Sequence, residues 1–320
     1  MAAQKAYKVE APSAPRASDM HPGFLDFPAD LPGGARPRIV LFGAPHGSTY
    51  PGADPSGFAG AAAAIRAASQ GDAQFLDSWD FDLDGPLFDG REPCCVDAGD
   101  LPTSVPDSAG NRRLIEAKTR AILAAGATPL MIGGDDSVPI PFFAGFADHG
   151  PIWILQIDAH IDWRDERYGE PMGYSSTMRR ASEMPHVAGI VQAGIRGVGS
   201  ARPLDVETAR RWGAHLVTAR EIHAEGVDAA LRHIPLGARI VVTFDCDGLD
   251  PSVMPGVAGR TPGGLTYQQA IGLIEGASRR GHLAGFDLIE FQTSADIDGI
   301  TALTAARILV NVIGRIVRQA

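Results

Sequence analysis

The sequence predicts an α/β fold in which helices cover both faces of a largely parallel sheet. From residue 38 onward, short apolar runs alternate with helical patterns, as in repeated strand–helix–strand units. Two of these runs also end in pairs of carboxylates, which is typical of buried parallel strands that reach a cleft. At 320 residues and 45% hydrophobic content, the chain is long enough to bury a large core. Because nothing marks an internal boundary, we expect a single three-layer domain over residues 36–320.

The individual elements follow from these apolar runs and from the turn residues between them. Strands are expected at 38–43, 94–97, 129–132, 152–158, 189–194, 215–217, 239–245 and 283–290. Helices are expected at 58–69, 111–125, 202–212, 225–234, 266–280 and 300–318. A Thr-x-x-Gln sequence beginning at Thr266 has the form of a capping box and supports a helix start there. Residues 1–35 are rich in Pro, Ala, Gly and Ser, and they predict an extended N-terminal arm.

Charge and composition exclude several classes of function. The net charge is −10 and no long basic run is present, so we expect neither nucleic acid nor an anionic membrane as partner. No stretch approaches the length of apolar sequence that spans a bilayer, and the N-terminus lacks the apolar core of a signal peptide. Three cysteines, of which Cys94 and Cys95 are adjacent, do not form a disulfide framework. We therefore expect a cytoplasmic, reduced protein.

The most informative segment is the apolar run 154–157, which is followed by Asp158, His160 and Asp162. In an extended strand alternate side chains share a face, so these three side chains would project together. Mixed oxygen and nitrogen donors of this kind favour a divalent metal. A capped turn is the alternative for an Asp-rich strand end.

A second segment favours the metal interpretation. The apolar run 239–244 ends in Asp245 and Asp247, which alternate in the same way. Carboxylates from two separate strands repel one another in a cleft unless cations hold them together. We therefore expect both segments to contribute to one metal site.

Two further positions are ambiguous on local sequence. Asp136 follows a strand that ends in a glycine pair, and by itself it is best explained as the N-cap of a short helix beginning near Pro139. Glu290 ends the last predicted strand, where α/β sites are built, although a solvated loop glutamate is equally consistent.

Taken together, these motifs resemble the ureohydrolase family of arginase, agmatinase and their relatives. The specific matches are Gly133-Gly134-Asp135-Asp136-Ser137, Asp158-Ala159-His160-Ile161-Asp162 and Asp245-Cys246-Asp247-Gly248-Leu249-Asp250-Pro251, and the softer ones are Val96-Asp97-Ala98-Gly99-Asp100 and the strand ending at Glu290. The resemblance implies a three-layer α/β/α sandwich around a parallel eight-stranded sheet. It also implies two divalent metals bridged by hydroxide, usually manganese and sometimes nickel.

The resemblance also assigns roles to single residues. Asp158 and Asp245 would bridge the metals, His160 and Asp247 would complete one metal site, and Asp162 would serve the other. Glu290 would pair with the guanidinium of a small cationic substrate, so that Glu290 and Asp162 count as catalytic residues. The implied reaction is attack of the metal-bound hydroxide on the guanidinium carbon, which releases urea and an amine.

The chain departs from the family pattern at two places. The first motif normally reads Gly-Gly-Asp-His-Ser, whereas here Asp136 stands in the place of the histidine. Aspartate is a hard oxygen donor, so we expect manganese above nickel and a weaker second site. The histidine that shuttles a proton in many members is also missing, and Tyr174 or Ser175 is the candidate that remains. Nearby, Arg179 and Arg180 suit ion pairs or an oligomer interface better than a cationic substrate.

Several alternatives stay open. The substrate could be agmatine, guanidinobutyrate, another ω-guanidino acid or a biguanide. Asp136 could instead mark a weakly active or inactive subunit that supports an active paralogue in a hetero-oligomer. A deacetylase-like enzyme with a single metal ranks last, because this chain lacks the adjacent histidine pair of such enzymes. By analogy with the family, a homotrimer or homohexamer is expected.

Overall fold

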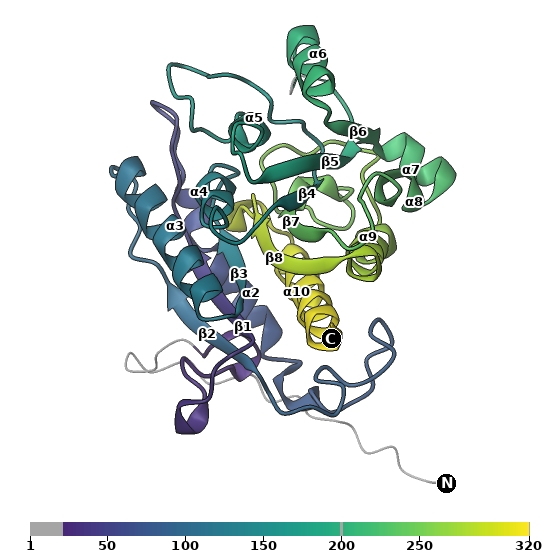
Figure 1. The fold of residues 1–320 in the computed structure, drawn as a ribbon. Helices are drawn as coiled ribbons and strands as arrows, with labels where there is room; N and C mark the ends of the chain where they lie inside the picture. Colours follow the sequence, from purple (N-terminus) through teal and green to yellow (C-terminus); the bar gives the residue numbers. More distant parts are fainter. Residues whose placement is uncertain (1–21, 199–200, 320) are drawn as a thin grey trace, which may run out of the picture.

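A computed structural model describes residues 22–198 and 201–319, and the part of the predicted arm at 1–21 lies outside the described residues. Its centre is a sheet of eight strands in the order β2-β1-β3-β8-β7-β4-β5-β6 (Figure 1). Every pair of neighbouring strands is parallel. The strands are β1 Ile39–Ala44, β2 Cys95–Asp100, β3 Thr128–Gly133, β4 Ile152–Ile157, β5 Val187–Ile195, β6 His215–Thr218, β7 Arg239–Asp245 and β8 His282–Ile289. Each predicted strand is present with small shifts at its ends, and the predicted fold class is confirmed.

Helices cover both faces of this sheet, because side chains alternate along each buried strand. In β1, Leu41 points into one apolar cluster and Phe42 into the other. The Leu41 face is covered by α2 Ala61–Ser69, α7 Ala219–Glu225, α8 Asp228–Leu231, α9 Tyr267–Arg280 and α10 Ile300–Arg318. The Phe42 face is covered by α3 Ser108–Ala124, α4 Pro139–Ala144, α5 Thr177–Ala181 and α6 Pro203–Trp212. A short helix α1, Ser56–Ala59, precedes α2. The result is a three-layer sandwich.

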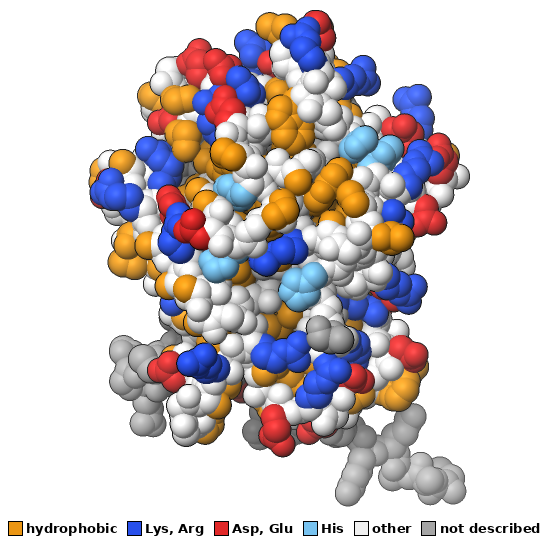
Figure 2. All heavy atoms as spheres, in the orientation of Figure 1, with side chains coloured by type: hydrophobic (Ala, Val, Ile, Leu, Met, Phe, Trp, Pro, Cys, Tyr) orange, Lys and Arg blue, Asp and Glu red, His pale blue; other side chains and the backbone are white. Residues whose placement is uncertain are grey.

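Helix α10 is long and apolar enough to cross a membrane by length and composition alone, with a mean hydropathy of 1.6 in its most apolar window. However, 72% of that window is buried, and the helix packs against α2, α9 and β8. Burial in the core accounts for this composition. On the face drawn in Figure 2, acidic and basic side chains are interspersed.

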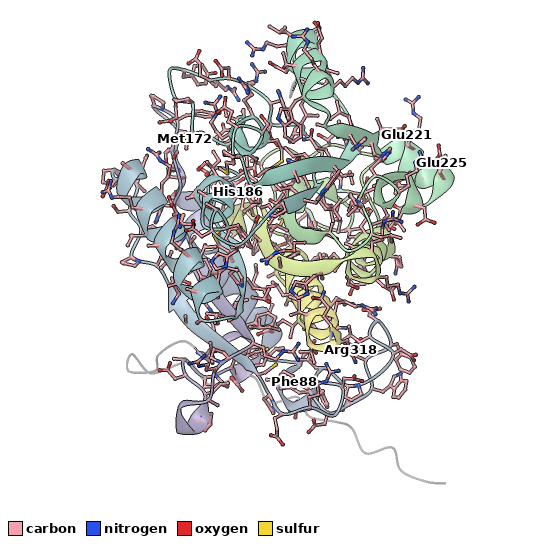
Figure 3. The ribbon with its side chains drawn as sticks, in the orientation of Figure 1. Phe88, Met172, His186, Glu221, Glu225 and Arg318 are labelled. Atoms are coloured by element: carbon pink, nitrogen blue, oxygen red, sulfur yellow. The ribbon has the colours of Figure 1, made fainter. Side chains whose placement is uncertain are left out.

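The helix expected at 225–234 is wrong in its bounds. Two short helices, α7 and α8, replace it, and Gly226 separates them with a φ of 80°. The start of α7 is fixed by Thr218, which forms a capping box with Glu221, labelled in Figure 3. This Thr-x-x-Glu signal was present in the sequence and was overlooked. By contrast, the capping box predicted at Thr266 is confirmed at the start of α9.

The segment predicted as an arm contributes to the core where it is described. Phe24, Leu25 and Phe27 are buried in the same cluster as α2. The Phe24 N–H donates to Asp97 Oδ2 at 2.8 Å, while Asp97 also pairs with Arg66. Residues 24–27 therefore pack against the sheet beside β2.

Candidate metal centre and active site

Four neighbouring strands bring the acidic residues to one edge of the sheet. In the order β3-β8-β7-β4, their carboxyl ends lie side by side. Asp136 follows β3, Glu290 follows β8, Asp245 ends β7 and Asp158 follows β4. Parallel strands deliver all these residues to the same end, which is where α/β proteins form their sites.

A cavity of about 430 Å³ opens above this edge. Its volume is in the range of small-molecule sites. Among the predicted site residues, it is lined by Asp136, His160, Asp162, Tyr174, Ser175, Asp245, Asp247 and Glu290. Asp158 lies beneath the lining and is 1% exposed. The structure thus gathers every predicted site residue at one cavity.

Within the described residues, two groups of side chains could each hold a metal ion. The first is Asp158, His160 and Asp247, and the second is Asp136, Asp158 and Asp162. In each group the ligand atoms lie within 4.8 Å of one another. Asp158 belongs to both groups, so its carboxylate stands between two candidate ion positions. Asp245 lies outside both groups, although it is buried and lines the same cavity.

The capping role that local sequence favoured for Asp136 is wrong. The N-cap of α4 is Val138, and no side chain caps that helix. Both carboxylate oxygens of Asp136 are buried without a hydrogen-bond partner. The backbone of Asp136 is held instead, because its N–H donates to Glu290 Oε1 at 2.8 Å and its carbonyl accepts from Thr177 Oγ1. A buried carboxylate with no donor is costly unless a cation or a proton joins it.

The acidic residues converge through turns and not through extended strands, so the geometric argument from alternation is wrong in detail. β4 ends at Ile157, and the His160 N–H then bonds back to Asp158 Oδ1 at 2.6 Å. Similarly, the Asp247 N–H bonds to Asp245 Oδ1 at 2.7 Å where a single 3₁₀ turn follows β7. These local bonds between side chain and backbone compete with the strand and end it.

Two site residues adopt the left-handed region that glycine normally occupies. The φ of Asp162 is 41° and that of Glu290 is 62°. Such backbone costs on the order of 1 kcal/mol or more for a non-glycine residue, and it clusters at functional sites. The close approach of the strands also needs glycine, because a Cβ at Gly248 would lie 2.8 Å from the Asp158 backbone nitrogen.

Crowding of buried carboxylates governs the electrostatics. Burial, followed by the neighbouring acids, raises the pKa of Asp136, Asp162 and Asp245 well above the ordinary range. Burial and Asp135 do the same to the pKa of Glu290. Because these acids repel one another and are buried, a cation placed among them would stabilise their charged forms.

His160 is the basic side chain among these acids. Burial opposes its protonation, yet hydrogen bonds and charges from Asp158 and Asp247 raise its pKa to about 12. Its Nδ1 lies 3.2 Å from Asp247 Oδ2 and 3.4 Å from Asp158 Oδ1. In turn, although burial acts the other way, His160 lowers the pKa of Asp247. In the absence of a cation, this imidazolium is the local counter-charge.

Sequence reasoning missed two buried glutamines behind the carboxylates. Gln156 Nε2 donates to Asp158 Oδ2 at 2.6 Å and to Asp162 Oδ2 at 2.9 Å. Gln192 Nε2 donates to the Gln156 side-chain oxygen and to the Ile161 carbonyl, the latter at 2.8 Å. The signal was visible, because Gln156 is a polar residue inside the apolar run of β4. This pair orients the two carboxylates, as outer partners commonly orient metal ligands.

Tyr174 and Ser175 line the cavity, whereas Arg179 and Arg180 are not among its lining residues. The Ser175 N–H donates to the Tyr50 hydroxyl at 3.0 Å, and the rings of Tyr50 and Tyr174 have centroids 4.4 Å apart. Arg179 and Arg180 pair with Glu183 at 3.0 and 3.3 Å, which confirms the ion pairs expected for them.

Comparison with known proteins agrees with this geometry. The Arginase family model matches residues 37–314. A guanidinopropionase from Pseudomonas aeruginosa is 35% identical over 219 residues, which are 67% of this chain and 68% of that protein. A guanidinobutyrase from the same species is 32% identical over 220 residues, which are 67% of this chain and 68% of that protein. The three-layer fold, with carboxylates at the ends of its central strands, is that of the arginase-type hydrolases. The chain belongs to the arginase family.

Solved structures support the same assignment. The proclavaminate amidino hydrolase from Streptomyces clavuligerus superposes with a TM-score of 0.79 at 28% identity, covering 96% of this chain and all of that chain, 100%. A formimidoylglutamase from Bacillus subtilis has the same TM-score of 0.79 at 22% identity, which shows the shared fold alone.

Proposed function

We propose that this protein hydrolyses a guanidino compound to urea and an amine, with two divalent cations, manganese first, at the candidate metal centre. The observation that carries the proposal is a pair of ligand groups sharing Asp158 beneath a cavity that also contains Glu290. The similarity of the chain to a guanidinopropionase and a guanidinobutyrase supports a guanidino substrate.

The donor set fits such cations. Asp158, His160 and Asp247 would hold one ion, and Asp136, Asp158 and Asp162 the other, with Asp245 as a further ligand. The two unpartnered oxygens of Asp136 would then gain a partner. Carboxylate-rich sites with little imidazole suit manganese better than softer ions. When bound, the cations would lower the pKa of water and supply a nucleophile at neutral pH.

The chain's own residues would bind and orient the substrate. Glu290 lines the cavity, and its Oε1 is fixed by the Asp136 N–H at 2.8 Å. A carboxylate fixed in this way can pair with a guanidinium and hold its carbon at a constant distance from the metal ligands. Tyr174 or Ser175 would relay a proton to the leaving nitrogen, since both border the same cavity.

Urea release tests the proposal. Manganese-loaded protein is offered agmatine, 3-guanidinopropionate, 4-guanidinobutyrate and a biguanide, and we expect urea from at least one of them. Glu290→Gln keeps the size of the side chain but removes its charge, and it should lower kcat/KM by roughly 100-fold or more. Arg211→Gln, on the distant helix α6, serves as the control and should be unchanged. Absence of urea from the whole panel at full metal occupancy would overturn the proposal.

A further inference from the structure

A turn that borders the cavity is closed by two backbone hydrogen bonds. Arg167 and Glu170 form an antiparallel bridge, with N–O distances of 3.2 and 3.0 Å. Between them, Tyr168 and Gly169 have φ values of 55° and 79°, as in a tight two-residue hairpin turn. The turn belongs to the long loop between β4 and α5, in which Figure 3 labels Met172. Left-handed backbone at a tyrosine is unfavourable by about 1 kcal/mol or more, so the contacts of Tyr168 and Arg167 must offset it.

Two tyrosine rings lie against the Arg167 side chain. The guanidinium carbon lies 5.0 Å from the Tyr168 ring centroid and 5.6 Å from that of Tyr50. The rings of Tyr50 and Tyr168 meet edge to face at 5.9 Å, and the Tyr174 ring lies 4.4 Å from that of Tyr50. Tyr50 itself is 3% exposed. The Arg167 Nη2 also donates to the Tyr168 hydroxyl at 3.4 Å, so the two rings and this bond position the guanidinium and leave its other N–H groups available.

Arg167 also lacks an acidic partner. Among the described residues, no carboxylate lies within ion-pairing distance of its guanidinium, whereas the nearby Arg179 and Arg180 pair with Asp165 and Glu183. Yet Arg167 lines the same cavity as Glu290 and the metal ligands. A fixed cation that borders a cavity without a counter-charge is suited to bind an anionic group of a ligand.

The cavity thus presents opposite charges to the two ends of a ligand. Its floor is acidic and takes a guanidinium, and its mouth carries Arg167. We infer that Arg167 binds the carboxylate of an ω-guanidino acid and so selects this class over ω-guanidino amines such as agmatine. The inference rests on the proposed hydrolysis of guanidino compounds and names the substrate class of that same site.

One nearby residue would favour an ω-guanidino amine over an ω-guanidino acid. Asp54 borders the same cavity, is exposed, and accepts the Ser56 N–H at 2.9 Å. It could receive the free amino group of agmatine instead. The inference requires Arg167, and not Asp54, to set the substrate preference, and the two side chains can be varied separately.

The test compares 4-guanidinobutyrate with agmatine, which differ at the far end of the chain. Arg167→Gln should raise KM for 4-guanidinobutyrate about 10- to 100-fold, because one charge-assisted contact is lost, with kcat within roughly threefold. For agmatine kcat/KM should stay the same or rise. Arg167→Lys keeps the charge but not the planar fork of N–H groups. Its KM for 4-guanidinobutyrate should lie between those of the unsubstituted protein and Arg167→Gln. Asp54→Asn and the distant control Arg211→Gln should leave the preference unchanged.

Several results would overturn the inference. These are equal losses on both substrates, no change on either, or a preference controlled by Asp54→Asn. Melting curves of the variants separate misfolding from a local effect, and Arg167→Lys serves if Arg167→Gln does not fold. If no substrate yields urea, calorimetric binding of 4-guanidinobutyrate decides: weaker binding by Arg167→Gln supports the inference although the proposed function has failed, and equal or absent binding overturns it.

Discussion

At the scale of single residues, Asp136 is where the sequence predicts a departure from the family pattern. The resemblance of the first motif predicts a histidine at this position. A carboxylate oxygen of Asp136 lies within 4.8 Å of those of Asp158 and Asp162, and neither Asp136 oxygen has a hydrogen-bond donor. With Asp136 the candidate centre contains five aspartates, which exceed the four positive charges of two divalent ions. Excess negative charge raises the pKa of bound water and weakens its activation.

We predict that Asp136→His strengthens the second metal site. The substitution removes one negative charge and provides a nitrogen donor, so manganese affinity at the weaker site should rise about tenfold and kcat should rise with it. Manganese titration followed by urea release measures both. Asp136→Asn, which removes the charge without adding imidazole, is the matched control and should weaken the site. Lower affinity in Asp136→His than in the unsubstituted chain would contradict this account of Asp136.

Gln156 leads to a second prediction for a single residue. Gln156→Leu removes the side-chain amide that donates to the carboxylates of Asp158 and Asp162 and fixes their orientation. We expect roughly tenfold weaker manganese binding, because outer partners of metal ligands contribute about this much. The distant Gln70→Leu should leave manganese affinity unchanged, and equal effects of the two substitutions would argue against an orienting role for Gln156.

At the scale of elements, helix starts explain which parts of the fold were predictable. The capping box at Thr266 could be predicted from the sequence because its bonds join residues three positions apart. The Gln269 N–H donates to Thr266 Oγ1 at 3.2 Å, and the Thr266 N–H donates to Gln269 Oε1 at 3.0 Å. Thr266→Ala should cost about 1 kcal/mol in the free energy of unfolding, measured by urea denaturation. Thr208→Ala, on the exposed side of α6, lies away from any cap and should change it by much less. If both variants lose a similar free energy of unfolding, the cap at Thr266 does not stabilise the protein beyond the effect of removing an ordinary threonine.

The outer edge of the sheet contains a pair of stacked histidines, His215 on β6 and His233 after α8. Their ring centroids are 4.1 Å apart with 16° between the planes. Burial lowers the pKa of both from the ordinary 6.5, and for His233 the neighbouring His215 lowers it further. Between the lowered pKa values and 6.5 the folded protein binds fewer protons than the unfolded chain, so stability is lost as the pH falls through this window.

The test of this pair is His215→Phe, which keeps a ring but cannot be protonated. We predict that the melting temperature of the unsubstituted protein falls more steeply between about pH 7 and pH 5 than that of His215→Phe. Parallel pH profiles for the two proteins would rule the pair out as a source of acid sensitivity.

The convergence of the site was predictable only in part. The sequence showed which strands end in acids, because apolar runs followed by Asp are visible without structure. The extended backbone predicted for Asp158 to Asp162 is nevertheless wrong. The hydrogen bond from the His160 N–H to the Asp158 side chain competes with the strand's backbone bonds, and residue alternation gives no sign of it. Arg167 and Tyr50 were not identified, because their contact joins residues more than a hundred positions apart and leaves no local pattern.

At the scale of the whole molecule, strand order creates the site. The order β3-β8-β7-β4 places four strand ends together that are far apart in sequence, and the two helical layers bury them. Burial concentrates carboxylates that repel one another, so the apo fold contains a region of unfavourable electrostatics. Cations would relieve this repulsion and so link metal binding to the stability of the entire sheet.

The most direct measurement is therefore the binding of manganese to chelator-stripped protein, recorded together with its melting temperature. We predict two ions per chain with unequal affinities, and a higher melting temperature as they bind. Asp247→Asn should mainly weaken the ion held by Asp158 and His160, and Asp162→Asn the ion held by Asp136 and Asp158. If saturating manganese binds to no site and leaves the melting temperature unchanged, the carboxylates at these strand ends do not form a metal centre, and the proposed chemistry is contradicted.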